Sequence, residues 1–348
     1  MTLTDLLTLA FNAQASDLHL SAGVVPMVRV DGQMRALQDV ALDSAQVLAL
    51  ILPTMNAYQR DTFEAHLEVD YAYTLDNGLR FRVNAFHQAR GVAAVFRLIP
   101  AQIIALAQLG VPPIFYTLCQ KLRGLVLVTG ATGSGKSTTL AAMVDYINTH
   151  RQAHILTIED PIEFIHPNKQ SLVNQREVKR DTHSFQAALR AALREDPDII
   201  LIGELRDLET IRLALSAAET GHLVLGTLHT ASAAKTIDRI IDVFDAAEKE
   251  MIRTMLSESL QAVISQTLVP KIGGGRMAAH EIMVGTAAIK NLIREAKVAQ
   301  MLSTMQTGRQ EGMQTLDQAL KMHLDAGAIT PEVAALFAQN KTLFSLSA

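Results

Sequence analysis

A glycine-rich segment in the chain has the residue types and the spacing of a phosphate-binding loop. It follows an apolar run, precedes a segment with helical periodicity, and ends in Lys136 and Ser137. The glycines let backbone N–H groups turn inward around a phosphate, and the helix that follows adds a favourable dipole. The lysine of such a loop reaches the β- and γ-phosphates, and the serine hydroxyl coordinates Mg²⁺. The residues that we expect to bind ATP are Gly130, Ala131, Thr132, Gly133, Ser134, Gly135, Lys136, Ser137 and Thr138.

Carboxylates follow two other apolar runs. Glu204 comes after the run at residues 199–202, and Glu159, Asp160 and Glu163 follow another. An isolated acidic cluster is usually a solvated loop, but these end predicted strands in a chain that also has a phosphate-binding loop. We expect Glu204 to organise a metal-bound water and Glu163 to activate the attacking water. Glu159 and Asp160 would support Glu163.

Two histidines flank the apolar run at residues 223–225. His222 precedes this run, and His229 follows it within residues 227–230. A single loop histidine is more often structural than catalytic, so His222 alone is the weaker candidate. His229 is expected at the carboxyl end of its strand, where it would contact the γ-phosphate and report hydrolysis to the next subunit.

The segments that must position these side chains alternate between short apolar strands and helices. The apolar runs lie at residues 125–129, 154–158, 199–202 and 223–226. Such runs are typical of buried parallel strands in an α/β sheet that is covered on both faces. Ligands bind beyond the carboxyl ends of the strands in these sheets. From Ala246 onward we predict mostly helix, with a glycine-rich turn at residues 273–275.

The N-terminal part has the pattern of a small α+β domain. Asp31-Gly32 and residues 76–78 are hairpin turn signals, each flanked by two short strand-like segments. An uncharged, proline-containing stretch separates this part from the α/β pattern. We therefore predict a first domain over residues 1–99, a linker over 100–113, and an α/β domain with a helical C-terminal region over 114–348.

Composition excludes several classes of partner and site. Hydrophobic residues make up 49% of the 348 residues, which suits two domains with large interiors. The formal net charge of −4 gives no electrostatic reason to expect nucleic acid as a partner. Cys119 is the only cysteine, so neither a disulfide nor a cysteine-held zinc is expected. No basic residue precedes the apolar N-terminal stretch, and prolines interrupt residues 98–120, so we expect a cytoplasmic protein without a membrane span.

Short motifs along essentially the whole chain match one family. They lie at residues 15–23, 80–86, 158–164, 226–230 and 288–295. With them the sequence resembles the type II/IV secretion ATPase superfamily and, within it, the PilT family of twitching-motility ATPases. The third motif resembles the Asp box of the family, the fourth its His box, and the last the motif linked to retraction. Lys290 departs from the arginine that is usual there, which keeps the charge and loses bidentate bonding.

The resemblance implies a homo-hexamer, in which each subunit has a PAS-like N-terminal domain and a RecA-like P-loop ATPase domain with nucleotide at their join. It implies hydrolysis of ATP, with Mg²⁺, to power retraction of type IV pili. The expected partners are the pilus assembly machinery and its inner-membrane platform protein, with the ATPase peripheral at the pilus base. Arg82 and Arg97 are candidate arginine fingers for a neighbouring subunit's γ-phosphate. Arg194, Arg206 and Arg239 are further candidates that the sequence does not rank.

Other functions remain open at this point. An accessory retraction ATPase would have the same motifs, so the sequence separates that paralogue only weakly. A RecA-like nucleic-acid motor shares the core fold, but the negative charge and the lack of a basic aromatic groove disfavour it. A kinase would need an acceptor pocket, which no motif indicates, and the acidic residues disfavour a scaffold without turnover. Retraction is favoured over pilus assembly because assembly ATPases commonly carry a tetracysteine zinc element.

Overall fold

The computed structural model describes residues 2–30, 32–99 and 102–344. Asp31, in the first predicted hairpin turn, and residues 100 and 101, at the start of the predicted linker, lie outside these described residues. The chain divides into two compact units, which follow the sequence except for one segment: Pro161–Ile165 belongs to the first unit with Met1–Gln102.

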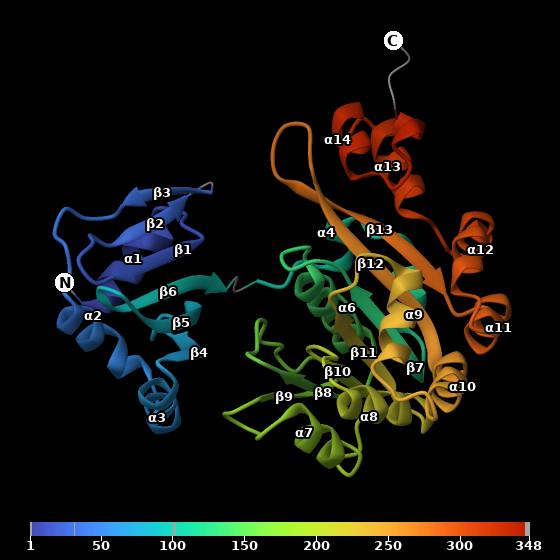
Figure 1. Cartoon of the computed structure of the whole chain (residues 1–348), viewed down its shortest axis with the longest axis horizontal. Coiled ribbons are helices and arrows are strands. Elements are labelled where there is room, and N and C mark those ends of the chain that lie inside the picture. Colours follow the sequence, from blue (N-terminus) through green and yellow to red (C-terminus); the bar gives the residue numbers. More distant parts are fainter. Residues whose placement is uncertain (1, 31, 100–101, 345–348) are drawn as a thin grey trace. The chain divides into compact units, whose positions relative to one another are not determined.

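The first unit contains an antiparallel sheet with the strand order β3-β2-β1-β6-β5-β4 (Figure 1). Its strands are β1 (Asp17–Ser21), β2 (Met27–Val30), β3 (Gln33–Ala36), β4 (Glu68–Thr74), β5 (Arg80–Gln88) and β6 (Gly91–Ile99). Its helices are α1 (Leu3–Asn12), α2 (Ser44–Ile51), η1 (Leu52–Thr54) and α3 (Ala57–His66). This is the predicted α+β architecture, and strands β4 and β5 confirm the second predicted hairpin.

Three helices of the first unit begin after residues whose side chains accept hydrogen bonds from the first turn of the helix. Thr2, Asp43 and Asn56 each cap a helix and form a capping box with the residue three positions on, which satisfies backbone donors that a helix start leaves free. The apolar faces of these helices pack on the sheet in one core, in which Leu7 and Phe96 are fully buried.

The second unit is built on a mixed sheet with the order β13-β12-β7-β11-β10-β8-β9. Its strands are β7 (Gly124–Thr129), β8 (His154–Glu159), β9 (Leu172–Glu177), β10 (Ile199–Ile202), β11 (Leu223–Leu228), β12 (Leu260–Pro270) and β13 (Arg276–Val284). All neighbours are parallel except β12 and β13. The four predicted apolar runs are therefore parallel strands, and their carboxyl ends share one edge of the sheet.

Helices cover both faces of this sheet (Figure 1). On one face α4 (Leu106–Leu109), α5 (Ile114–Cys119) and α6 (Lys136–His150) pack against Val126 and Val128 of β7. On the other face Leu125 and Leu127 meet a larger helical layer. That layer consists of α7 (Phe185–Ala192), α8 (Leu208–Glu219), α9 (Ala233–Asp242), α10 (Lys249–Ser259), α11 (Ala287–Arg294) and α12 (Met301–Thr307). This alternation follows from the two-residue period of a strand.

The C-terminal region corrects one prediction. Mostly helix was expected from Ala246 onward, but β12 and β13 form a long hairpin here, and β12 extends the sheet beside β7. Gly273, Gly274 and Gly275 form its turn, all with positive φ, so the predicted glycine-rich turn is confirmed as a hairpin turn. The region is mostly helical as expected, but the hairpin was not predicted, because a long apolar run that is buried on both faces shows no period that separates strand from helix.

The remaining helices follow that hairpin. They are η2 (Val298–Gln300), η3 (Arg309–Glu311), α13 (Leu316–Asp325), α14 (Pro331–Phe337) and η4 (Lys341–Phe344). Helices α13 and α14 pack with the distal part of the hairpin in a small core of their own, around Val269 and Leu320.

The segment predicted as a linker packs largely with the second unit, which begins at Ile103. Leu106 of α4 is buried in the same core as Phe115 of α5. Across the described ranges, every helix is too short or too polar to cross a membrane.

Candidate active site

The phosphate-binding loop leaves strand β7 and enters helix α6 in the predicted context. Gly130, Gly133 and Gly135 have φ values of 141°, 78° and 87°. A side chain at such values is strained, and glycine adopts them freely. Gly135 is also the residue from which α6 starts. The backbone therefore makes the tight turn that directs N–H groups toward an anion at a helix N-terminus.

Lys136 and Ser137 occupy the first turn of α6. Lys136 Nζ donates hydrogen bonds to the carbonyls of Gly130 (2.9 Å) and Ala131 (3.0 Å), and the residue is only 9% exposed. Ser137 is exposed to solvent. The ammonium thus lies against the loop whose phosphate it is expected to neutralise, and the hydroxyl is accessible to a metal ion.

Glu204 lies at the same edge of the sheet, just beyond β10. Backbone hydrogen bonds hold both its neighbours: Gly203 N–H donates to Ile158 of β8 (2.8 Å), and Leu205 N–H donates to Thr227 of β11 (2.9 Å). The Thr227 hydroxyl donates in turn to the Gly203 carbonyl. The strands on either side of β10 therefore fix the position of the Glu204 backbone.

The Glu204 carboxylate is largely buried, with 13% of its side chain exposed, and meets two groups. Arg206 Nε lies 2.5 Å from its Oε2, and His229 Nε2 lies 3.5 Å from the same oxygen. Arg206 was one of the arginines that the sequence did not rank, and here it is the ion-pair partner of the acid. The structure thus brings together two of the predicted site residues, Glu204 and His229.

His222 lies elsewhere. It precedes β11 and so occupies the amino edge of the sheet, opposite the edge with the phosphate-binding loop. Its Nδ1 is 2.9 Å from the carbonyl oxygen of Ala217, and its own carbonyl accepts from Gly124 N–H. These contacts give it a structural place at the start of the strand, and we assign it no part in the chemistry.

The Asp-box acids divide between the two units. Glu159 ends β8 and accepts hydrogen bonds from the Thr157 hydroxyl (2.7 Å) and from Gln175 Nε2 (3.3 Å). Asp160 lies 3.5 Å from Lys179 Nζ. Glu163 belongs to the first unit.

Arg80 holds the segment that contains Glu163. Its guanidinium donates to the backbone carbonyls of Ile162 (2.8 Å) and Glu163 (3.1 Å). A guanidinium has several donors in a fixed plane, which suits two neighbouring carbonyls. Arg80 thus has a structural partner inside the first unit.

The two candidate arginine fingers lie side by side in the first unit. Arg82 of β5 is directly opposite Arg97 of β6, and Arg97 is opposite Asp17 of β1. Arg97 Nε is 2.8 Å from the buried Asp17 carboxylate, whose pKa is lowered by hydrogen bonds from Ser16 and Arg97 against the opposing effect of burial. Arg82 is exposed, and within the described ranges no ion-pair partner is found for it.

Sequence reasoning missed two glutamines that hold these loops. Gln175 of β9 accepts from the His166 backbone N–H (2.8 Å) and donates to Glu159, so it fixes both ends of the Asp-box loop. Burial lowers the pKa of His166 to about 4, which leaves it neutral there. Gln266 of β12 contacts the phosphate-binding loop. A polar residue inside an apolar run was the available signal for Gln266, but the strand that contains it was not predicted.

Comparison with known proteins identifies the family. Residues 1–274 match the family described as type II/IV secretion system protein. The chain belongs to this family. It is 63% identical to the type IV pilus retraction ATPase PilT of Pseudomonas aeruginosa, over 96% of this chain and 97% of the relative. A twitching motility protein of Neisseria gonorrhoeae is 56% identical, over 92% of this chain and 86% of the relative.

A solved structure leads to the same family. The crystal structure of the pilus retraction motor PilT with bound ADP has a TM-score of 0.91 and 47% identity, and covers 99% of this chain and 98% of that one. These matches confirm the predicted family, the fold class and the ATPase activity. The predicted function in pilus retraction agrees with the names of these relatives.

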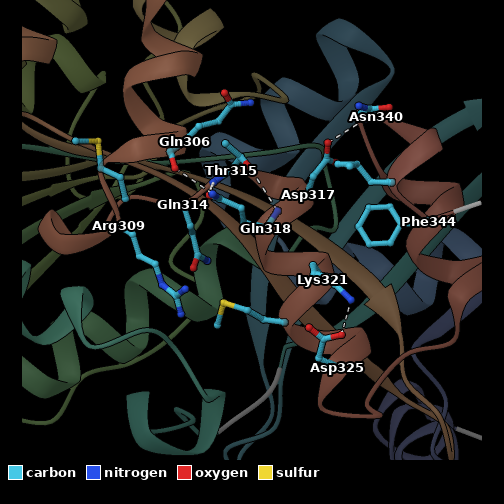
Figure 2. Close-up of a pocket in the computed structure, with 13 residues that line it drawn as sticks. Gln306, Arg309, Gln314, Thr315, Asp317, Gln318, Lys321, Asp325, Asn340 and Phe344 are labelled. Atoms are coloured by element: carbon cyan, nitrogen blue, oxygen red, sulfur yellow. Dashed lines mark hydrogen bonds and ion pairs between the residues drawn. The ribbon is translucent and has the colours of Figure 1, made fainter.

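A pocket with a volume of about 640 Å³ lies among the C-terminal helices. Figure 2 shows Gln306, Arg309 and Lys321 around it, with Phe344 at one side. Lys321 pairs with Asp325, and Asp317 accepts the backbone N–H groups of residues 339 and 340. None of the residues predicted to act on nucleotide lines this pocket.

Proposed function

We propose that this ATPase works as a ring of six identical chains that hydrolyses Mg·ATP to retract type IV pili. It would act from the cytoplasmic side of the inner membrane on a platform protein at the pilus base. The observation that supports it best is the shared edge of the second unit's sheet: the phosphate-binding loop, Glu204 and His229 follow strands β7, β10 and β11, which are neighbours. The names of the relatives supply the mechanical task.

Each predicted site residue has a part in the proposed reaction. The loop N–H groups and the Lys136 ammonium bind the β- and γ-phosphates. Glu204 orients water at the γ-phosphate, and His229, beside its carboxylate, senses loss of that phosphate. Glu163 is proposed as the base for the attacking water, with Glu159 and Asp160 in support.

The residues present fit a magnesium ion that is held mainly by the nucleotide. In the described part of the chain, no group of three or more His, Cys, Asp or Glu side chains could hold a metal ion by itself. Mg²⁺ is ordinarily bound through phosphates, waters and one or two protein oxygens, and the Ser137 hydroxyl and the Glu204 carboxylate are suited to that arrangement. Bound there, the ion neutralises charge that develops on the transferred phosphate.

Replacement of Glu204 by glutamine tests the proposed site. We expect Glu204→Gln to bind ATP about as tightly as the original chain and to lose roughly 100-fold or more in turnover, because the loop and Lys136 supply most of the binding and the carboxylate acts mainly through water. Phosphate release and the affinity for ATP are to be measured on the same preparation.

The matched control is Glu209→Gln, which removes a carboxylate of helix α8 that pairs with Arg190 of helix α7. It should leave turnover within about twofold of the original, as surface changes generally do. Undiminished turnover in Glu204→Gln would remove Glu204 from the mechanism.

A further inference from the structure

Gln266 lies where strand β12 passes the phosphate-binding loop. It comes directly after Ser265, which pairs with Thr129 at the end of β7. The residue is 3% exposed, in a strand that is mostly buried. A buried amide nearly always has its hydrogen bonds satisfied, so its partners show what this side chain holds in place.

Both ends of the Gln266 amide are bonded to the nucleotide-binding segment. Its Nε2 donates to the carbonyl of Ser134 in the loop at 2.6 Å, and its Oε1 accepts from the Thr139 hydroxyl of α6 at 2.7 Å. The Ser134 carbonyl can only accept, which fixes the orientation of the amide. One side chain thus joins the middle of the loop to the helix that follows it.

Two glycines of the loop permit this close approach. A Cβ on Gly130 would lie 2.4 Å from the carbonyl oxygen of Gln266, and a Cβ on Gly135 would lie 2.8 Å from its Nε2. Both distances are shorter than the contacts that a real Cβ atom makes with a non-bonded neighbour. The first and third glycines of the loop therefore make room for Gln266 as well as for the turn of the backbone.

A second glutamine of the same strand provides an internal comparison. Gln261 lies at the opposite end of β12, where its Nε2 donates to the Arg123 carbonyl at 3.1 Å. A Cβ on Gly124 would meet that side chain at 2.6 Å. Gln261 thus has the same kind of contact with the amino end of β7 that Gln266 has with its carboxyl end. The amino end lies at the edge opposite the phosphate-binding loop.

We propose that Gln266 is a positioning residue for the nucleotide phosphates, which acts through Ser134 and Thr139 and does not itself touch the nucleotide. Its two hydrogen bonds hold the loop and the start of α6 in a single arrangement before nucleotide binds. A loop that is already ordered loses less conformational entropy on binding, and this raises affinity. The inference rests on the proposed function, in which this loop binds the phosphates.

The test is Gln266→Leu in the full chain, with Gln261→Leu as its matched control. We expect the Kd for ADP with Mg²⁺ to rise about tenfold in Gln266→Leu, the scale of one buried hydrogen bond or two, and to stay within about twofold in Gln261→Leu. In steady-state kinetics the loss should appear mainly in KM, because the loop binds substrate and product alike. Hydrogen exchange of the amides of residues 131–135 without nucleotide should become faster in Gln266→Leu alone.

A variant outside β12 keeps the proposal testable if Gln266→Leu does not fold. Thr139→Val removes only the hydroxyl that donates to Gln266 and nearly preserves shape, and it should raise the Kd for ADP about threefold. Where Gln266→Leu does fold, adding Thr139→Val to it should weaken binding no further, because the two residues share one interaction.

The outcomes separate the inference from the function on which it rests. An unchanged Kd for ADP in both Gln266→Leu and Thr139→Val, or an equal rise in Gln261→Leu, overturns the positioning role. A fall in kcat with KM and loop exchange unchanged also overturns it, since that pattern indicates general damage. If the original chain itself binds no ADP, the proposed function fails together with the inference.

Discussion

At the scale of single residues, the interior of the secretion ATPase holds a buried histidine, His280, whose Nε2 has no hydrogen-bond partner among the described residues. His280 of β13 is 4% exposed and packs edge-on against the Phe115 ring at a centroid distance of 5.1 Å. Burial, with a smaller contribution from the neighbouring His323, lowers its pKa to about 4. An ordinary histidine takes up its proton near pH 6.5, so His280 stays neutral in the folded chain over a range in which the unfolded chain binds a proton.

This difference predicts acid sensitivity. Between pH 6.5 and about 4 the unfolded state binds a proton at residue 280 and the folded state does not, so the stability that the neutral ring provides is present above pH 6.5 and is lost as the pH falls. The loss reaches roughly 3 kcal/mol at most. His280→Leu should flatten the decline of the thermal unfolding midpoint in that window, whereas the exposed His183→Leu should not. Parallel curves for His280→Leu and the original chain would contradict this account.

At the scale of elements, helix α11 supplies the cations that α10 lacks. Helix α10 has no basic residue in its last turn, where free carbonyls carry partial negative charge. Lys290 Nζ of α11 donates to the Glu258 carbonyl at 3.0 Å, and Arg294 Nη1 lies 3.1 Å from the Glu258 carboxylate. Two basic residues of the predicted retraction motif therefore hold the C-terminal end of another helix.

Replacement of Lys290 should loosen that end. Lys290→Ala removes a charge-assisted bond to a helix terminus, which contributes roughly 0.5 to 1 kcal/mol at such sites. We expect faster hydrogen exchange in the last turn of α10, with ATP turnover within about twofold, since this contact is remote from the predicted site residues. Lys290→Arg should behave as the original, and Lys297→Ala, which breaks a surface pair with Glu295, serves as the control. Unchanged exchange in Lys290→Ala would show that the cap contributes nothing.

At the scale of the whole molecule, we propose that residues of a second chain complete the predicted nucleotide site. The phosphate-binding loop belongs to the second unit, and Arg82 belongs to the first, where its exposed guanidinium is adjacent to the paired Arg97. Of the two candidate fingers, Arg82 is thus the one whose charge is not already paired with Asp17. This makes Arg82 the better candidate for a neighbouring chain's γ-phosphate, and Arg97 the residue beside it.

Mixing of two inactive variants tests whether sites are shared. Arg82→Ala should lose at least about 100-fold in turnover with the mass of the ring unchanged, because an arginine finger stabilises charge in the transition state. Lys136→Ala should be inactive because it lacks the phosphate-binding ammonium. Mixed rings should regain turnover, since a loop from the first variant can meet an arginine from the second.

Arg90→Ala, an exposed change in the same unit, is the control for Arg82→Ala. Turnover per chain should also rise with concentration as rings form. Full turnover by a monomer, or no recovery in mixtures of the two inactive variants, would exclude the shared site.

The amino-acid sequence by itself determined the parts of this protein whose signals are local. The phosphate-binding loop is encoded by glycines at fixed spacing between a strand and a helix, and the four parallel strands by short apolar runs. Glu204 and His229 were found for the same reason, because each follows one of those runs and parallel strands end at one edge. Family, fold class and ATPase activity follow from these motifs.

Only the tertiary structure decided which residues meet across the chain. The β12–β13 hairpin was not predicted, so Gln266 could not be placed beside a loop more than 120 positions earlier. The meeting of His229 with Glu204 depends on strand order and direction, because these residues follow β11 and β10, which are neighbours. A residue's own type and spacing carry no information about such partners, because packing of distant segments against one another creates these contacts.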